Sequence, residues 1–341
     1  MWGGYFKRLL NEGSEDRAVV DGEWEEELRG VGNVEEGRGI TMAEVEGAIK
    51  KLKKGKAAGS DGILGEMIRA GGDALCRWLV RVMNVCWERG GVPQDWQEAC
   101  VVPVYKGKGD KSECGSYRGI SMMSVVGKLY GRVVIDRVKN LTEGLVGEEQ
   151  GGFRKGRGCV DQIFAVKGLC EKYREKGREI YLGFMDLEKA YDRIDREALW
   201  RVMGKYGING RLITALKSFY GNSRACVKMD GWMGESFEVK VGLRQGCVMS
   251  PWLFNVYMDS IVREVKRECM EEGLNLQSER GGVQWRVNML LYADDTVFFF
   301  YGWSEKTFKR LPIKHRVVWD FYLTKKTRQH LESRPARVWA D

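Results

Sequence analysis

Residues 290–300 read Leu-Leu-Tyr-Ala-Asp-Asp-Thr-Val-Phe-Phe-Phe, and this stretch decides the fold. Two apolar runs rich in aliphatic and aromatic residues flank a short acidic break, which predicts two buried strands joined by a hairpin turn. The turn carries Asp294 and Asp295. Burying adjacent carboxylates without partners is costly, and a bound cation is their usual compensation. The stretch therefore predicts a metal site at a hairpin turn.

A second acidic strand end lies upstream, where residues 181–186 read Tyr-Leu-Gly-Phe-Met-Asp. If this strand and the hairpin are neighbours in one sheet, Asp186 comes close to Asp294 and Asp295. Three carboxylates can hold two Mg²⁺ ions roughly 3.5–4 Å apart, the arrangement used for in-line phosphoryl transfer. The prediction depends on residues more than a hundred positions apart meeting at one edge of a sheet.

The composition narrows the chemistry. The chain has 341 residues, of which 43% are hydrophobic and 30% charged, as is ordinary for a soluble globular protein. Both histidines, His315 and His330, lie near the C-terminus, which excludes Ser-His-Asp hydrolysis, Cys-His proteolysis and histidine metal sites from the main body. Nine cysteines without C-x-x-C spacing argue against a zinc finger and favour a reduced intracellular compartment, nuclear or cytoplasmic.

The charge and hydropathy patterns indicate which kinds of partner the chain could bind. No apolar run approaches the roughly 20 residues of a membrane span, so no membrane partner is expected. The polar N-terminus does not resemble a signal peptide. The net charge is +8, but most of the surplus falls in residues 303–341. Local basic clusters in the main body are therefore better indicators of an anionic partner than the total charge.

Three Gly-rich basic segments are candidates for phosphate contacts. Residues 55–63 lack the Walker A order, so an ATPase P-loop is not supported. Lys106 opens a basic turn and Arg118 begins the next element, so these two could line a triphosphate or a nucleic-acid backbone. A solvated Lys/Gly hairpin is the alternative. Residues 151–158 form the third segment, in which three cations are expected to face water or phosphate: Arg154, Lys155 and Arg157.

Local capping signals mark several helix starts. Thr41 and Glu44 have the spacing of a capping box, and Asp195 stands where an N-cap is expected. Another helix is predicted to start with Ser250 as N-cap and Pro251 as its first residue, and Gln245 and Gly246 lie just before it. A glycine at such a position lets a ligand approach the backbone closely.

Five blocks, taken in order, resemble the reverse transcriptases of non-LTR (LINE-type) retrotransposons. The blocks are 117–120, 152–157, 184–186 with 190–192, 244–246 with 250–254, and 292–295. The resemblance extends from about residue 41 to residue 297 and implies an α+β fold, the right-hand polymerase fingers and palm, with an antiparallel palm sheet packed on helices.

The resemblance also implies a division of the chain. Residues 1–40 are expected to be a loosely attached, partly flexible lead-in, 41–178 the fingers with the first part of the palm, 179–301 the palm carrying the acidic site, and 302–341 an atypical basic tail that is poorly ordered. After Phe300 the sequence departs from the family pattern, so the thumb is expected to be absent and the chain a truncated or decayed copy.

In such enzymes two Mg²⁺ ions, with Mn²⁺ as a substitute, align a primer 3′-OH with the α-phosphate of a dNTP. The resemblance implies that Asp186 and Asp294 are the main metal ligands, that Asp295 completes the cluster and that the Leu187 carbonyl adds a ligand. Tyr191 matches the position that lies under the sugar and excludes a 2′-OH, although a simple core role is the alternative.

The remaining site residues follow from the same resemblance. Nucleotide contacts are implied for Lys106, Arg118, Gln245 and Gly246. Further phosphate contacts are implied for Arg154, Lys155 and Arg157, the last of which could equally be solvated. The implied partners are an RNA template, a DNA primer and dNTPs, and the oligomeric state stays open.

The sequence thus favours an RNA-directed DNA polymerase domain of a mobile element. The alternative is a catalytically inactive remnant that retains nucleic-acid binding. An RNA-dependent RNA polymerase or a telomerase-like relative is a third possibility. An aromatic residue at Tyr191 argues against the RNA polymerase, because it is expected to block ribonucleotides.

Overall fold

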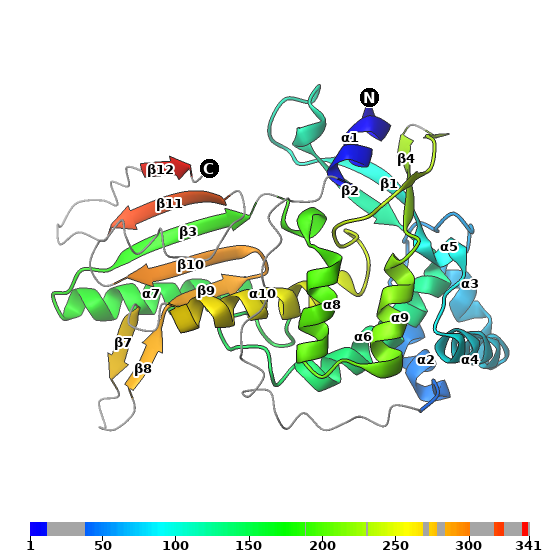
Figure 1. Ribbon diagram of the computed structural model, residues 1–341, viewed down its shortest axis with the longest axis horizontal. Coiled ribbons are helices and arrows are strands. Elements are labelled where there is room, and N and C mark those ends of the chain that lie inside the picture. The colour runs from blue at the N-terminus through cyan, green and yellow to red at the C-terminus, as the bar shows by residue number, and fades with distance from the viewer. Residues whose placement is uncertain are drawn as a thin grey trace. The chain divides into compact units, whose positions relative to one another are not determined.

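A computed structural model describes residues 1–11, 38–187, 189–229, 231–268, 273–277, 284–300, 317–323 and 336–339 (Figure 1). It combines helices with mixed and antiparallel sheets, which confirms the predicted α+β class. The chain divides into two compact units. Unit 1 contains the described residues of 1–145 and 191–254, and unit 2 those of 146–190 and 255–341. The division differs from the continuous segments that the sequence suggested, because the chain leaves unit 1 and returns to it.

Unit 1 is mainly helical around a five-stranded sheet. Its helices are α1 (Trp2–Leu9), α2 (Met42–Lys50), α3 (Gly65–Ala70), α4 (Gly72–Arg89), α5 (Gln94–Gln97), α6 (Val125–Thr142), α8 (Arg196–Lys205) and α9 (Gly210–Tyr220). Its strands are β1 (Glu98–Tyr105), β2 (Tyr117–Met122), β4 (Arg224–Met229), β5 (Trp232–Met233) and β6 (Phe237–Glu238). The order is β2-β1-β4-β5, with β6 also on β4; β1 pairs antiparallel with β2 and parallel with β4.

Unit 2 is built on an antiparallel sheet of order β12-β11-β3-β10-β9. The strands are β3 (Tyr181–Leu187), β9 (Met289–Tyr292), β10 (Asp295–Phe300), β11 (Val317–Leu323) and β12 (Ala336–Trp339), and a separate ribbon pairs β7 (Leu274–Gln277) with β8 (Gln284–Val287). Its helices are α7 (Cys159–Glu175) and the part of α10 (Ser250–Glu268) that follows residue 254.

The core of unit 2 joins α7 to the sheet. Leu169 and Tyr173 of α7 pack in one buried cluster with Leu182 of β3 and with Val297 and Phe299 of β10. Val297 and Phe299 alternate along β10, so they share the sheet face that packs on α7. Asp186 near the end of β3 and Asp295 at the start of β10 are thereby carried by strands that pack in this core.

The predicted basic tail falls mostly outside the described residues. Two segments of it are described, and both are strands: β11 pairs along the whole of β3, from Val317 opposite Leu187 to Leu323 opposite Tyr181, and β12 pairs with β11. The sequence of this tail has no clear amphipathic period, and no strand was predicted in it.

Residues 1–11 differ from the loosely attached lead-in that the sequence suggested. Phe6 of α1 is only 3% exposed and belongs to a cluster with Val101 of β1 and with Ala225 and Val227 of β4. The Asn11 side chain also donates a hydrogen bond of 2.7 Å to the Glu238 carbonyl. A helix of eight residues is marginal by itself, so this packing is what stabilises α1.

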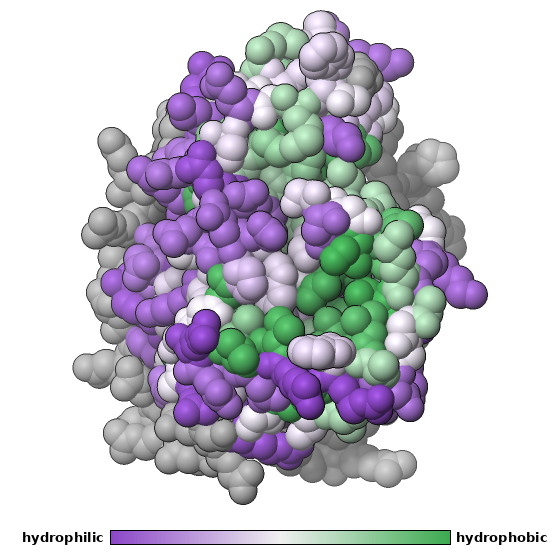
Figure 2. All heavy atoms as spheres, turned by 90° about the vertical axis from the view of Figure 1, so that its right-hand side faces the viewer, coloured by the Kyte–Doolittle hydropathy of each residue, from purple (hydrophilic) through white to green (hydrophobic). Residues whose placement is uncertain are grey.

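One face of α4 carries exposed apolar side chains. Trp78, Val82 and Val85 follow one another at helical spacing and are 61%, 41% and 44% exposed. The Arg81 guanidinium lies 5.3 Å from the centre of the Trp78 ring. Figure 2 shows hydrophobic surface gathered on the side of the protein that carries α3 and α4 in Figure 1.

None of the helices in the described part of the chain combines the length and the apolar character needed to cross a lipid bilayer.

The predicted capping box at α2 is present, and an arginine reinforces it. The Thr41 hydroxyl accepts from the Glu44 N–H, and the Glu44 carboxylate accepts from the Thr41 N–H. Arg137 of α6 binds both carboxylate oxygens of Glu44, at 2.7 and 2.9 Å. Partial burial alone would raise the pKa of Glu44, but the hydrogen bonds from Arg137 and Thr41 outweigh it and lower the pKa to about 2.

We expect Glu44→Gln to lower the free energy of unfolding at pH 6 and to have little effect at pH 2. Because the pKa of Glu44 is depressed in the folded state, its contribution is present above the ordinary value of 4.5 and is lost as the pH falls towards 2. Urea unfolding of both proteins at each pH measures the difference. An equal difference at pH 6 and pH 2 would contradict the assignment.

Candidate active site

The acidic hairpin is the first half of the candidate site. Tyr292 at the end of β9 pairs with Asp295 at the start of β10, which leaves Ala293 and Asp294 as the two turn residues. Ala293 has a φ of +59°, in the left-handed region that a non-glycine residue adopts only when its surroundings hold it there. The predicted hairpin is therefore present, and its turn has an uncommon backbone conformation.

Strand pairing brings the second acidic strand end to the same place. β10 pairs antiparallel with β3, with Thr296 opposite Met185, so Asp295 and Asp186 follow at the same end of the two strands. The sequence-based condition that the two strands be neighbours is met. Leu187 ends β3 beside Asp186, and it is half-buried.

The carboxylates influence one another. Partial burial and the nearby charge of Asp186 together raise the pKa of Asp295. Like charges held close together are relieved by a cation, and carboxylate oxygens are the ligands that Mg²⁺ prefers, so the donor set fits a divalent ion. Within the described residues, however, no three His, Cys, Asp or Glu side chains are grouped closely enough to hold a metal. The structure thus brings the carboxylates to one sheet edge without closing them into a finished cluster.

Replacing Asp186 by Asn is expected to lower the pKa of Asp295, because the substitution removes the charge that opposes ionisation. The carboxyl carbon resonance of Asp295, followed by NMR from pH 2 to pH 8 without divalent ions, reports this pKa directly. An unchanged titration would mean that the two carboxylates do not interact.

Unit 1 holds the candidate nucleotide contacts. Tyr191, in the short 3₁₀ helix η3 (Ala190–Arg193), stacks on Phe254 with ring centres 4.6 Å apart and planes 8° apart. The Gln245 side chain donates a 3.0 Å hydrogen bond to the Asp192 carboxylate. The Leu243 N–H donates to the Tyr191 carbonyl at 2.7 Å. Within unit 1, therefore, the structure brings Tyr191 and Gln245 into one neighbourhood, although they lie more than fifty residues apart.

Gly246 lies against strand β2. The Ser121 N–H donates to the Gln245 carbonyl at 2.8 Å. Gly246 has a φ of +98°, and a Cβ atom there would lie 2.9 Å from the Ser121 carbonyl oxygen. Both the backbone conformation and the close approach therefore require glycine.

The two candidate triphosphate residues both belong to the β1–β2 hairpin. Arg118 lies in β2 opposite Val104, and Lys106 directly follows Tyr105, the last residue of β1. Both cations are exposed. The Lys106 ammonium donates a 2.8 Å hydrogen bond to the Gly115 carbonyl, which fixes it beside the turn.

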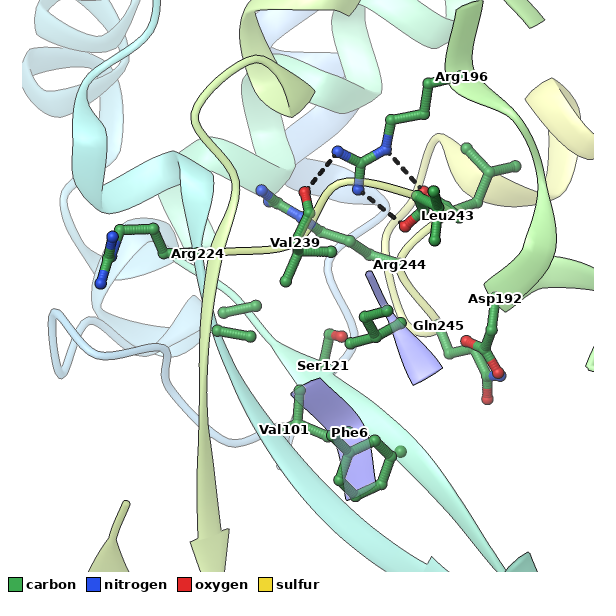
Figure 3. Close-up of a pocket in the computed structure, with 16 residues that line it drawn as sticks. Phe6, Val101, Ser121, Asp192, Arg196, Arg224, Val239, Leu243, Arg244 and Gln245 are labelled. Carbon is green, nitrogen blue, oxygen red and sulfur yellow. Dashed lines mark hydrogen bonds between the residues drawn. The ribbon is translucent and has the colours of Figure 1, made fainter. Parts of the chain in front are cut away.

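Two buried arginines support the segment that leads to Gln245, and the sequence analysis assigned a role to neither of them. Arg196 donates to the carbonyls of Val239 and Gly242 at 2.8 and 3.0 Å, and Arg244 donates to that of Phe219 at 2.9 Å. Figure 3 shows them beside a small pocket that Asp192 and Gln245 also line. No local pattern marks these cations as internal, because their acceptors are backbone carbonyls of distant segments.

The 154–157 segment corrects one expectation. Its three cations were expected to face water or phosphate, which is wrong for Arg154, because this side chain is 6% exposed and donates to the Gly147 carbonyl at 2.8 Å. Arg157 is partly exposed and binds the Glu148 carboxylate, and Lys155 is exposed. Arg154 therefore stabilises its own loop, and only Lys155 and Arg157 stay candidates for phosphate contacts.

The comparison with known proteins defines the class. A family model described as reverse transcriptase (RNA-dependent DNA polymerase) matches residues 106–329, more than half of the chain. The chain therefore belongs to the reverse transcriptase family.

Individual relatives come from mobile elements. The chain is 25% identical over 258 residues to the uncharacterized 149 kDa protein of transposon TX1 from Xenopus laevis, covering 76% of this chain and 19% of that protein. It is 27% identical to the RNA-directed DNA polymerase from mobile element jockey of Drosophila melanogaster, covering 64% and 24%. It is 29% identical to a putative 115 kDa protein in the type-1 retrotransposable element R1DM of the same species, covering 67% and 22%.

These matches confirm the resemblance to the reverse transcriptases of non-LTR retrotransposons. The chain spans about a fifth to a quarter of the length of these relatives.

Proposed function

We propose that this chain is an RNA-directed DNA polymerase domain that adds deoxynucleotides to the 3′-OH of a DNA primer on an RNA template. The observation that carries the proposal is the pairing of β3 with β10, which brings Asp186 and Asp295 to one sheet edge next to the Asp294 turn. Membership of the reverse transcriptase family supports the assignment of this edge to nucleotidyl transfer.

Asp186 and Asp294 would hold two Mg²⁺ ions, for which Mn²⁺ can substitute, with Asp295 and the Leu187 carbonyl as supporting groups. When bound, the ions lower the pKa of the primer hydroxyl and offset the charge of the leaving pyrophosphate. The raised pKa of Asp295 supports this role, because burial and the nearby charge of Asp186 both disfavour the ionised carboxylate, and a bound cation would offset both effects.

The residues of unit 1 would bind and select the nucleotide. Tyr191, whose ring is held by stacking on Phe254, would lie under the sugar and exclude a 2′-OH. Gln245 and Gly246 would contact the incoming nucleotide and the template. Lys106 and Arg118 would neutralise the triphosphate, and Lys155 and Arg157 would contact phosphates of the nucleic acid.

Primer extension on an RNA template with Mg²⁺ tests the proposal. The wild-type chain is expected to extend the primer. Asp294→Asn is expected to reduce the rate by more than about 100-fold, because changing a residue that only hydrogen-bonds to a metal ligand already lowers metal affinity or activity 10- to 100-fold. Asp73→Asn, an exposed aspartate in the first turn of α4, is the matched control and should extend normally.

Extension that survives in Asp294→Asn would refute the assignment of the acidic hairpin. Salt-sensitive RNA binding by a wild-type chain that extends no primer would instead support the non-catalytic alternative, because phosphate contacts do not need the carboxylates.

Tyr191→Ala is expected to reduce the preference for dNTPs over rNTPs by about tenfold or more, the scale of one steric contact in a pocket. Tyr191→Phe keeps the ring and its stacking on Phe254, so it should keep the preference. Single-nucleotide incorporation with each substrate gives the ratio of kcat/KM values. An unchanged ratio in Tyr191→Ala would favour the core role for this side chain.

A further inference from the structure

A loop of unit 2 pairs with the strand that leads into the acidic turn. The Leu291 N–H donates to the Glu149 carbonyl, and the Gly151 N–H donates to the Leu291 carbonyl, both at 2.8 Å. These bonds form a short parallel bridge between Gln150 and Leu291. The loop around Gln150 therefore runs beside β9 towards Ala293.

The Gln150 side chain continues this pairing to the turn itself. Its Oε1 accepts from the Ala293 N–H at 2.9 Å, and its Nε2 donates to the Ala293 carbonyl at 3.1 Å. The same Oε1 accepts from the Gly152 N–H at 2.8 Å. Gln150 is 2% exposed, so water does not compete for these bonds. One buried amide thus satisfies both polar backbone groups of the residue that immediately precedes Asp294.

The fit between loop and turn leaves no spare room. A Cβ atom on Gly152 would lie 2.9 Å from the Ala293 Cα and 3.0 Å from the Gln150 Oε1. Ala293 is 8% exposed and has a φ of +59°, which alanine does not favour. The turn therefore needs an external partner to keep this conformation, and Gln150 is the side chain that contacts it at both backbone groups.

Helix α10 holds the 147–152 loop through two side chains. Asn255, which is fully buried, donates from Nδ2 to the Gly152 carbonyl at 2.7 Å. Asp259, one turn further along, accepts from the Gly147 N–H at 2.7 Å. Arg154 binds the Gly147 carbonyl from inside the loop. Both ends of the loop are therefore held, so Gln150 approaches the turn from a rigid base.

We propose that Gln150 is a positioning residue that sets the backbone of the Ala293–Asp294 turn and thereby the direction of the Asp294 carboxylate, with Asn255 acting through Gly152. The proposal rests on the proposed polymerase function, because the direction of Asp294 matters only where it binds a metal. Neither residue touches the ion or the substrate.

The test compares Gln150→Leu and Gln150→Glu with wild type. Leucine removes all three hydrogen bonds of the side chain, whereas glutamate keeps the acceptor for the two N–H groups and loses the donor to the Ala293 carbonyl. Gln94→Leu, at an exposed position in α5, is the control. Two measurements are made on each full chain: amide hydrogen exchange of a peptide covering 291–296, and the affinity for Mn²⁺ alone from the EPR signal of the free ion.

In Gln150→Leu, the amides of the 291–296 peptide are expected to exchange faster, with other peptides unchanged. This variant is also expected to bind Mn²⁺ about 10- to 100-fold more weakly, the usual effect of changing a residue that orients a metal ligand. Gln150→Glu should lie between leucine and wild type in hydrogen exchange. Gln94→Leu should match wild type in both measurements. In primer extension, kcat should fall more than the KM for dNTP changes, because nucleotide contacts lie elsewhere.

Unchanged exchange of the 291–296 peptide in Gln150→Leu, or Mn²⁺ affinity within about twofold of a wild type that binds the ion, would overturn the proposal. If the leucine variant fails to fold, the same criteria apply to Gln150→Glu. If wild type binds no Mn²⁺ and extends no primer, the proposed function fails, and the exchange measurement alone then decides whether Gln150 holds the turn.

Discussion

Electrostatic repulsion between carboxylates at the end of an apolar sheet is the constraint on which the rest of unit 2 depends. Burial and the nearby charge of Asp186 together raise the pKa of Asp295, so holding its ionised carboxylate at this sheet end has a cost to folding. The buried aromatic run Phe298 to Phe300 and the packing of α7 on the sheet oppose that cost. A loosely packed sheet would relax by moving the strand ends apart.

The backbone of Ala293 in the acidic turn is held by a neutral side chain. The side chain that contacts Ala293 is an amide, as is that of Asn255 behind Gly152. An amide satisfies a buried backbone N–H and C=O without adding charge. A lysine or arginine at the same place would form an ion pair with the carboxylates and compete with a metal ion. The hydrogen bonds from Gln150 therefore fix the backbone of Ala293 without adding a charge.

In unit 1, charged side chains rather than neutral amides hold the segment that leads to Gln245. Arg196 and Arg244 are buried among backbone carbonyls, and Tyr220 lies beside both guanidinium groups. Burial lowers the pKa of Arg196 to about 10, so the side chain remains charged at neutral pH. A buried cation is tolerated only when its donors are satisfied, which makes these arginines selective for one arrangement of the segment before Gln245. The positive charges of Arg196 and Arg244 compete with no metal ion, because no metal site is proposed beside these two side chains.

The amino-acid sequence by itself determined the features that depend on local pattern. The apolar runs around Asp294, the capping box at Thr41 and the order of the five blocks gave the strands, a helix start and the family, because these signals come from neighbouring residues and side-chain periodicity. Only the tertiary structure decided the inward position of Arg154, the packing of α1 and the contact between Gln150 and Ala293. Gln150 and Ala293 are 143 positions apart, and which distant group satisfies a buried donor or acceptor is settled only when the chain has folded.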